Sequence, residues 1–212
     1  MMPQQQVITP ATEDKEIIAR ILAGEKHLYE NLMRKYNSRM FRISMSIIND
    51  DMDAEDIMQT AYISAYQQLR SFTGKSAFST WLIRILINES LLHKKRRLRR
   101  QEILSKQEII ESHNDTPLNS LMNKELKNIL EKAVLTLPEK YRLVFVMREI
   151  ENMSTCETMD VLNIGESNVK IRLNRAKEML RNELSTQFKS QQLFDFHLTR
   201  CDRVVNFVMD RI

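Results

Sequence analysis

The chain has 212 residues, of which 42% are hydrophobic, so it has room for one ordinary domain or two small ones with packed cores. Its 3 glycines and 4 prolines, against abundant Leu, Ile, Met, Lys, Glu and Arg, favour helices joined by short turns over sheets. No apolar run approaches the roughly 18 to 20 residues of a membrane span, and Cys156 and Cys201 form no paired ligand motif, so we expect an all-α cytoplasmic protein with no disulfide, metal or cofactor.

A first helical block is expected over residues 14–100, after a polar N-terminal tail at residues 1–13. Apolar residues recur in this block at helical spacing. One such stripe consists of Ile57, Ala61, Ala65 and Leu69. We interpret the block as a bundle of several helices.

The helix that begins near Asp53 carries acidic residues outside this stripe. Asp53 and Asp56 fall on its exposed side, which makes that side a candidate surface for docking a cationic protein. The alternative is purely structural, because the helix dipole stabilises acidic residues in a first turn by ~0.3 to 1 kcal/mol each whatever the function.

An aromatic loop at residues 72–80 leads into a helix that ends in a basic run at residues 94–100. Aromatic rings stack on bases and cations hold phosphates, so this order suits a protein that grips a nucleic-acid strand whose bases are open. The total net charge of +4 is modest, and repulsion among so many adjacent cations is hard to explain without an anionic partner.

Within this segment, one helix face is expected to carry Arg84, Asn88 and Lys95 beside Trp81. Phe72, with Lys75 and Ser76 in the loop, is placed to close over an unstacked base. The opposite, core-facing side is expected to consist of Phe78, Leu82, Ile85 and Leu92. The alternative for Phe72, Phe78 and Trp81 is that all three are core anchors.

A polar connector at residues 101–117, with room for a short helix at 101–111, precedes a second block at residues 118–186. Pro138 is expected at a first helical position, and Ser154 with Glu157 forms a capping-box pattern. A turn at residues 163–165 then leads to a helix from Glu166 to Leu184.

This last helix is expected to face inward through Val169, Leu173, Ala176 and Leu180. The remaining side is a polar and cationic set suited to a DNA major groove. It consists of Ser167, Asn168, Lys170, Ile171, Arg172, Asn174 and Arg175. Cap, short helix, turn and basic helix together favour a DNA-binding helix-turn-helix over the alternative of a bare helical hairpin.

Taken in order, residues 53–59, 72–88, 137–142 and 169–176 resemble the bacterial RNA polymerase sigma factors of the extracytoplasmic-function (ECF) group, within the sigma-70 family. The resemblance covers most of the chain, from about residue 14 to residue 184. It implies that the first block is sigma region 2, that the second is sigma region 4, and that a flexible linker joins them.

The resemblance also implies roles for particular residues. Those expected to bind the clamp helices of the largest subunit of core RNA polymerase are Asp53, Glu55, Asp56 and Gln59. Those expected to bind the promoter minus-ten element are Phe72, Lys75, Ser76, Trp81, Arg84, Asn88, Lys94, Lys95, Arg96 and Arg97. The outward set between Ser167 and Arg175 is expected to read the minus-thirty-five element.

A tail at residues 187–212 is predicted to form an amphipathic helix that packs on one of the domains. His197 and Cys201 faintly resemble the His and first Cys of zinc-binding anti-sigma domains, but Val204 stands where a second Cys is required. We therefore expect no metal site.

The sequence analysis thus predicts a sigma factor whose partners are core RNA polymerase, through its clamp helices and flap, promoter DNA and an anti-sigma factor. No catalytic residue and no small-molecule substrate are expected, because the chain has no phosphate-cradling Gly-rich loop and no nucleophile motif. Two alternatives stay open. One is a helix-turn-helix regulator that acts on duplex DNA without core polymerase, and the other is a helical adaptor that binds only proteins.

Overall fold

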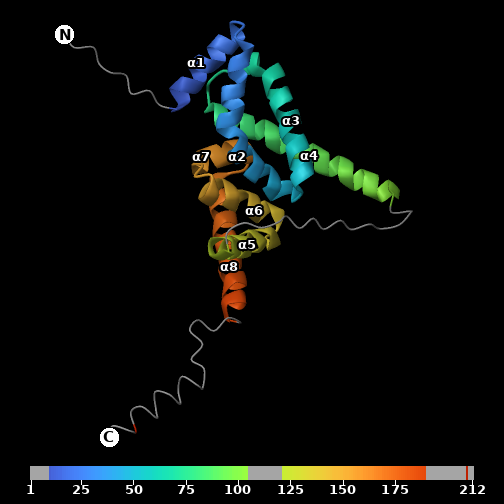
Figure 1. Ribbon diagram of the computed structural model, residues 1–212, viewed down its shortest axis with the longest axis vertical. Coiled ribbons are helices and arrows are strands. Elements are labelled where there is room, and N and C mark those ends of the chain that lie inside the picture. The colour runs from blue at the N-terminus through green and yellow to red at the C-terminus, as the bar shows by residue number, and fades with distance from the viewer. Residues whose placement is uncertain (1–9, 105–120, 190–208, 210–212) are drawn as a thin grey trace, which may run out of the picture.

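The computed structural model describes residues 10–104, 121–189 and 209, and these residues form helices and no strand (Figure 1). The first block contains α1 (Pro10–Leu22), α2 (Tyr29–Ile48), α3 (Asp51–Gln67) and α4 (Phe78–Leu104), with the 3-10 turns η1 (Lys26–Leu28) and η2 (Leu69–Ser71). The second contains α5 (Leu121–Thr136), α6 (Glu139–Phe145), the π-helical turn η3 (Val146–Ile150), α7 (Thr155–Leu162) and α8 (Glu166–Lys189). The predicted all-α fold with two helical blocks is confirmed.

Parts of the sequence-based prediction lie outside the described residues. These are the connector from residue 105 onward, the greater part of the short helix at 101–111, and the C-terminal tail beyond Lys189, apart from Met209, with His197 and Cys201. Inside the described residues, α4 continues as one helix to Leu104, and α8 continues to Lys189.

Local side-chain chemistry explains where several helices begin and end. The Asp50 side chain caps α3 by accepting a hydrogen bond of 3.0 Å from the backbone N–H of Asp53. Ser154 and Glu157 form the predicted capping box of α7, and Asn163 ends that helix in the left-handed conformation, with φ of 51°. Pro138 was expected inside α6 but lies at its N-cap, because its ψ of 137° is extended.

The first block is built around the long helices α2, α3 and α4, which all contact one another in the upper half of Figure 1. The predicted stripe on α3 is confirmed, since Ile57, Ala61, Ala65 and Leu69 are all buried. On α4, Phe78 and Leu82 are buried as expected and Ile85 is half-buried. Leu92 was expected in the core but is 47% exposed, because the C-terminal part of α4 projects beyond the bundle (Figure 1).

The second block packs α8 against α5, α6 and α7. The predicted inward stripe of α8 is confirmed, with Val169, Ala176 and Leu180 buried and Leu173 half-buried. This block also touches the first one: α7 contacts α4, and both α6 and η3 contact α2. None of the helices among the described residues is long and apolar enough to cross a membrane.

Candidate nucleic-acid interface

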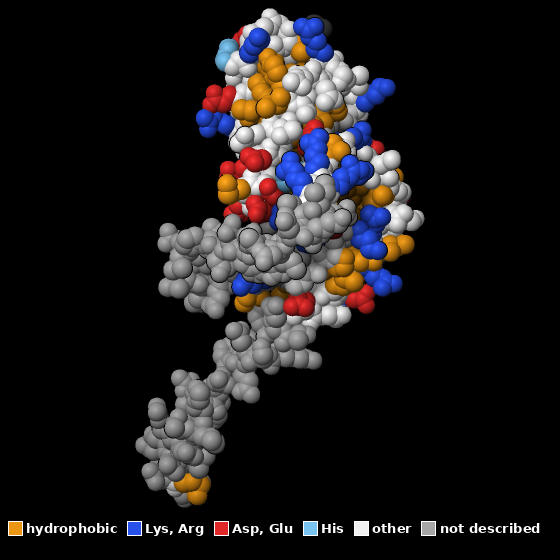
Figure 2. Space-filling view, turned by 90° about the vertical axis from the view of Figure 1, so that its right-hand side faces the viewer, with side chains coloured by type: hydrophobic (Ala, Val, Ile, Leu, Met, Phe, Trp, Pro, Cys, Tyr) orange, Lys and Arg blue, Asp and Glu red, His pale blue; other side chains and the backbone are white. Residues whose placement is uncertain are grey.

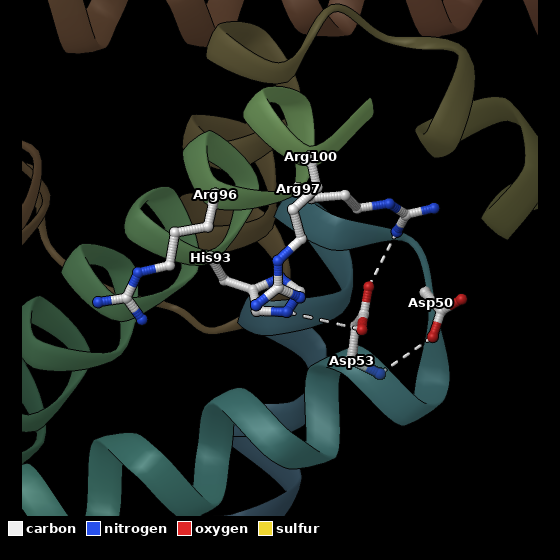
Figure 3. A pocket seen from close by; sticks show the side chains of 6 residues that line it. All are labelled: Asp50, Asp53, His93, Arg96, Arg97 and Arg100. Carbon is white, nitrogen blue, oxygen red and sulfur yellow. Dashed lines mark hydrogen bonds and ion pairs between the residues drawn. The ribbon is translucent and has the colours of Figure 1, made fainter. Parts of the chain in front are cut away.

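The acidic residues of α3 fall into two groups. Glu55, Asp56 and Gln59 are exposed to solvent. Asp53 instead turns toward α4, where its carboxylate pairs with Arg97 at 2.9 Å and lies 3.7 Å from Nε2 of His93 (Figure 3). The predicted docking surface therefore keeps three residues free to face a partner protein, while Asp53 holds the basic end of α4 against the start of α3.

Around this ion pair lies a hollow of about 420 Å³ between the start of α3 and the basic end of α4 (Figure 3). Its lining residues are Asp50, Asp53, His93, Arg96, Arg97 and Arg100. Figure 2 shows Lys and Arg side chains gathered halfway down one face of the molecule, next to a group of Asp and Glu side chains. Cationic and acidic surfaces thus meet here.

His93 and Arg100 were absent from the predicted site residues. The signal that finds them is helical spacing, because residues 93, 96, 97 and 100 follow the i, i+3, i+4, i+7 pattern and so share one helix face. One face of the basic run thus lines the hollow beside α3, while other cations of the run are exposed.

The aromatic residues pack as a cluster with different degrees of exposure. Phe72 lies 5.6 Å from Phe78 and 5.4 Å from Trp81, measured between ring centroids. Phe78 is 2% exposed and belongs to the core, whereas Phe72 and Trp81 are half-buried. Phe72 and Trp81 therefore each offer part of a ring to a ligand, on a support made by Phe78.

The loop before α4 reverses direction at Gly74, whose φ of 71° favours glycine. Lys75 on this loop is exposed and Ser76 is half-buried. On α4 itself, Arg84, Asn88 and Lys95 are exposed, as expected for a nucleic-acid-facing side. The loop and the helix thus bring aromatic, amide and cationic groups to one region of the first block.

Two of the predicted strand-binding cations already have partners in the second block. Arg84 donates a hydrogen bond of 2.5 Å to the backbone carbonyl oxygen of Asp160, and Lys94 pairs with the Glu139 carboxylate. Lys95 and Arg96 are exposed beyond these contacts. The side of α4 that is expected to face a nucleic-acid strand is therefore partly covered by the second block.

The helix-turn-helix presents the predicted residues of α8 outward. All but one are exposed: Ser167, Asn168, Lys170, Ile171, Asn174 and Arg175. Arg172 is half-buried, and Ile171 is 58% exposed although it is apolar. An exposed apolar side chain among polar and cationic ones is suited to a groove that offers both phosphates and thymine methyl groups.

Comparison with known proteins connects these surfaces to a family. Residues 32–101 match the family model described as Sigma-70 region 2, and residues 127–180 match the one described as Sigma-70, region 4. The chain is 30% identical over 179 residues to the ECF RNA polymerase sigma factor SigW of Bacillus subtilis. That alignment covers 80% of this chain and 96% of the relative.

Two solved structures share the fold. One is the sigma factor RpoE of Bartonella quintana in complex with the anti-sigma factor NepR, with a TM-score of 0.63 and 22% identity over 74% of this chain and 96% of that one. The other is CnrH in complex with the cytosolic domain of CnrY, with a TM-score of 0.59 and 22% identity over 82% of this chain and 97% of that one. The region order, the helix-turn-helix and the sequence identity agree, and the chain belongs to the ECF RNA polymerase sigma factors.

Proposed function

We propose that this chain directs transcription initiation by binding core RNA polymerase and recognising promoter DNA at two places. The observation that carries the proposal is the presence, in one chain, of an aromatic and basic surface on α4 and a helix-turn-helix that exposes the polar side of α8. The first suits an open strand and the second suits a duplex groove. A helix-turn-helix regulator that binds duplex DNA without core polymerase does not need a surface for an open strand. The family matches do not favour that alternative.

The minus-ten contacts are assigned to the loop and α4. Phe72 and Trp81, with Lys75 and Ser76, are proposed to hold a flipped base, and Arg84 with Asn88 is proposed to hold the strand beside it. The cations at positions 94–97 follow along the backbone. Stacking of one base on an aromatic ring contributes ~1 to 3 kcal/mol, and flipping a base costs a few kcal/mol. Because the two nearly cancel, stable opening of the duplex requires the core enzyme.

The minus-thirty-five contacts are assigned to the exposed side of α8. A recognition helix reads base edges through residues in its N-terminal part. Ser167, Asn168 and Lys170 lie in the first turns of α8, so they are the proposed base-reading residues. Ile171, Arg172, Asn174 and Arg175 extend the same surface toward the phosphates.

The polymerase contacts are assigned to Glu55, Asp56 and Gln59 on the exposed side of α3. Asp53 is proposed to support this surface from behind, since its carboxylate is held by Arg97. Charge reversal at Asp56 (Asp56→Lys) is expected to weaken binding to core polymerase by about tenfold, because like charges across an interface oppose association. Glu178→Lys on the exposed part of α8 is the matched charge reversal outside this surface.

The chain is proposed to carry out no chemical step of its own and to work in the cytoplasm, where core polymerase and DNA are found. An anti-sigma factor is a further proposed partner. The support is that the two structures of similar fold are complexes of RpoE with the anti-sigma factor NepR and of CnrH with the cytosolic domain of CnrY.

Reconstitution with core polymerase tests the proposal. Purified chain and core enzyme are incubated with fragmented genomic DNA, and the 5′ ends of the transcripts are mapped. Discrete start sites that appear only when the chain is present support the function, and their upstream sequences give both promoter elements. If core enzyme plus the chain initiates nowhere that core enzyme alone does not, the proposed function is wrong.

A further inference from the structure

A lysine of α1 lies across the loop that is proposed to hold a flipped base. Cε of Lys15 lies 3.4 Å, and its Nζ 3.7 Å, from the position that a Cβ atom on residue 74 would occupy. The side chain therefore packs over the backbone of Gly74. Helix α1 also contacts η2 and α4, the two elements that this loop connects. The loop that carries Lys75 and Ser76 thus has a cation from a separate helix beside it.

The ammonium group of Lys15 is available to an anion. Lys15 is exposed, and among the described residues no acceptor pairs with it. The two carboxylates that precede it in sequence are held by Lys35 on α2, which lies 2.7 Å from Asp14 and 3.7 Å from Glu13. An exposed cation beside an aromatic loop is suited to a backbone phosphate of a strand whose base enters that loop.

A buried carboxylate fixes α1 in this position. Asp14 is 2% exposed and accepts hydrogen bonds from Nζ of Lys35, at 2.7 Å, and from the hydroxyl of Tyr36. Burial, together with the hydrogen bond to Asp14, raises the pKa of Tyr36, so its hydroxyl stays protonated and remains a donor. A carboxylate removed from water requires such partners. Because Asp14 and Lys15 are adjacent, the contacts that hold Asp14 against α2 also fix the backbone from which Lys15 extends.

The same contacts reach the aromatic cluster. The Tyr36 ring lies 5.8 Å from the Phe78 ring, measured between ring centroids. Phe78 in turn lies 5.6 Å from Phe72 and 5.7 Å from Trp81 by the same measure. Helix α1 is therefore connected to the rings that are proposed to stack on a base, both through the core and across the surface of the loop.

No role was predicted for α1 from the sequence. The minus-ten contacts were expected only at residues 72–97, and α1 lies ahead of residue 32, where the match to Sigma-70 region 2 begins. Lys15 and Gly74 are far apart in sequence, and their contact depends on how α1 packs across the first block (Figure 1).

We propose that α1 is part of the strand-binding site: Lys15 holds a backbone phosphate next to the flipped base, and Asp14 positions Lys15. This inference rests on the proposed function, because it takes the loop at residues 72–80 to hold a base of the promoter strand. A phosphate contact carries no sequence information. Lys15 therefore adds affinity for the strand and does not select the base.

The salt dependence of strand binding tests the phosphate contact directly. Each phosphate neutralised on a single strand contributes about 0.7 to the slope of log K against log salt concentration. The protein is the full chain bound to core polymerase. The probe is a fluorescent promoter strand, taken from a mapped start site, that is single-stranded across the minus-ten element. Lys15→Gln is expected to lower the slope by about 0.7 and to weaken binding roughly fivefold at low salt.

Two further variants separate the phosphate contact from packing over the loop. Lys15→Arg keeps a cation on a long side chain and is expected to keep the wild-type slope. Lys26→Gln removes an exposed lysine from η1, beyond the other end of α1, and is expected to change neither slope nor affinity. If Lys15→Gln keeps the full wild-type slope, the proposal is overturned, because a lysine with a purely structural role changes affinity without changing the number of phosphates neutralised.

A second probe, which differs only in its minus-ten bases, tests whether the contact is made to the backbone. Lys15→Gln is expected to weaken binding of both probes by the same factor. A loss confined to one of the two sequences would show that Lys15 contacts a base, and the assignment to a phosphate would be wrong.

A double-mutant cycle tests the positioning role of Asp14. Asp14→Asn removes the charge that pairs with Lys35, so α1 is held less firmly on α2. In that background Lys15→Gln is expected to weaken strand binding clearly less than in wild type, and equal losses would overturn the positioning role. Tyr36→Phe removes only the hydroxyl donor to Asp14 and takes the place of Asp14→Asn if that variant does not fold.

Start-site mapping distinguishes failure of this inference from failure of the proposed function. If the wild-type chain directs initiation and Lys15→Gln keeps the full salt slope, the function stands and α1 is not part of the strand-binding site. If the wild-type chain directs no initiation, the proposed function is refuted and this inference is refuted with it.

Discussion

The two surfaces of this chain that are proposed to bind DNA differ in how accessible they are. The proposed base-reading side of α8 is exposed from Ser167 to Asn174, apart from the half-buried Arg172. On α4, Arg84 and Lys94 are instead engaged by the second block. The comparison teaches that the proposed duplex-reading residues are open to solvent, whereas two of the proposed strand contacts already have partners in the second block.

The largest expected effect separates support from contact within the aromatic cluster. Phe78→Ala is expected to lower the free energy of unfolding by ~3 to 5 kcal/mol, because Phe78 is buried beneath Phe72 and Trp81. Urea denaturation followed by circular dichroism measures it. Phe72→Ala, at a half-buried ring, is the comparison and should cost clearly less; equal losses would mean that Phe72 is a core residue too.

Assays of promoter opening and of duplex binding should distinguish the two surfaces that are proposed to bind DNA. Phe72→Ala is expected to reduce formation of the open promoter complex about 5- to 150-fold, equivalent to the ~1 to 3 kcal/mol of one stacked base. It should leave binding of the complex to closed duplex DNA nearly unchanged. Permanganate reactivity of unpaired thymines measures opening, and gel retardation measures duplex binding.

Lys170→Ala is expected to have the opposite effect, because Lys170 is one of the proposed base-reading residues of α8. It should weaken duplex binding while sparing the opening of DNA that is already bound. If both variants impair both steps equally, the division of labour between α4 and α8 is wrong.

A smaller effect is expected at the start of the helix-turn-helix. Ser154→Ala removes the side chain that accepts from the Glu157 backbone N–H at 3.1 Å, and loss of such a cap costs ~1 kcal/mol. The measurement is the thermal unfolding midpoint of the full chain. Ser185→Ala, at an exposed position late in α8, is the control and should have little effect.

The same capping box predicts a pH dependence. Burial acts to raise the pKa of Glu157, but hydrogen bonds with Ser154 and Thr80 together outweigh it, so the pKa lies below its ordinary value. A carboxyl group with a lowered folded-state pKa stabilises the fold above its unfolded pKa and loses that contribution as the pH falls through the folded value. Unfolding titrations should therefore show a shallower acid dependence for Glu157→Gln than for wild type, and parallel curves would contradict this role.

The smallest effect is expected at the ion pair between α3 and α4. Arg97 and Asp53 are partly exposed, and pairs of this kind contribute ~0.2 to 1 kcal/mol. Arg97→Gln should lower the free energy of unfolding by no more than that, against Arg99→Gln as a neighbouring control. A loss above about 2 kcal/mol would show that the pair is a principal support of the first block.

The sequence predicted what depends on local pattern. The stripe from Ile57 to Leu69, the capping box at Ser154 and the left-handed Asn163 all follow from residues within a few positions of one another. His93 and Arg100 could have been found in the same way, from their spacing on α4.

What could not be predicted depends on tertiary packing. Arg42 and Glu151 form an ion pair between the two blocks although they are 109 positions apart, and no periodicity links them. Leu92 was assigned to the core because its helical phase is right, but phase does not say where the bundle ends. Asp53 was assigned to a protein partner because its charge is visible in the sequence, while its pairing with Arg97 depends on how α4 crosses α3.

The most direct test of the account maps the transcription start sites made by core polymerase with and without the full chain. The account predicts discrete start sites that appear only when the chain is present, because the chain is proposed to recognise both promoter elements. Initiation at the same sites by core enzyme alone would contradict it.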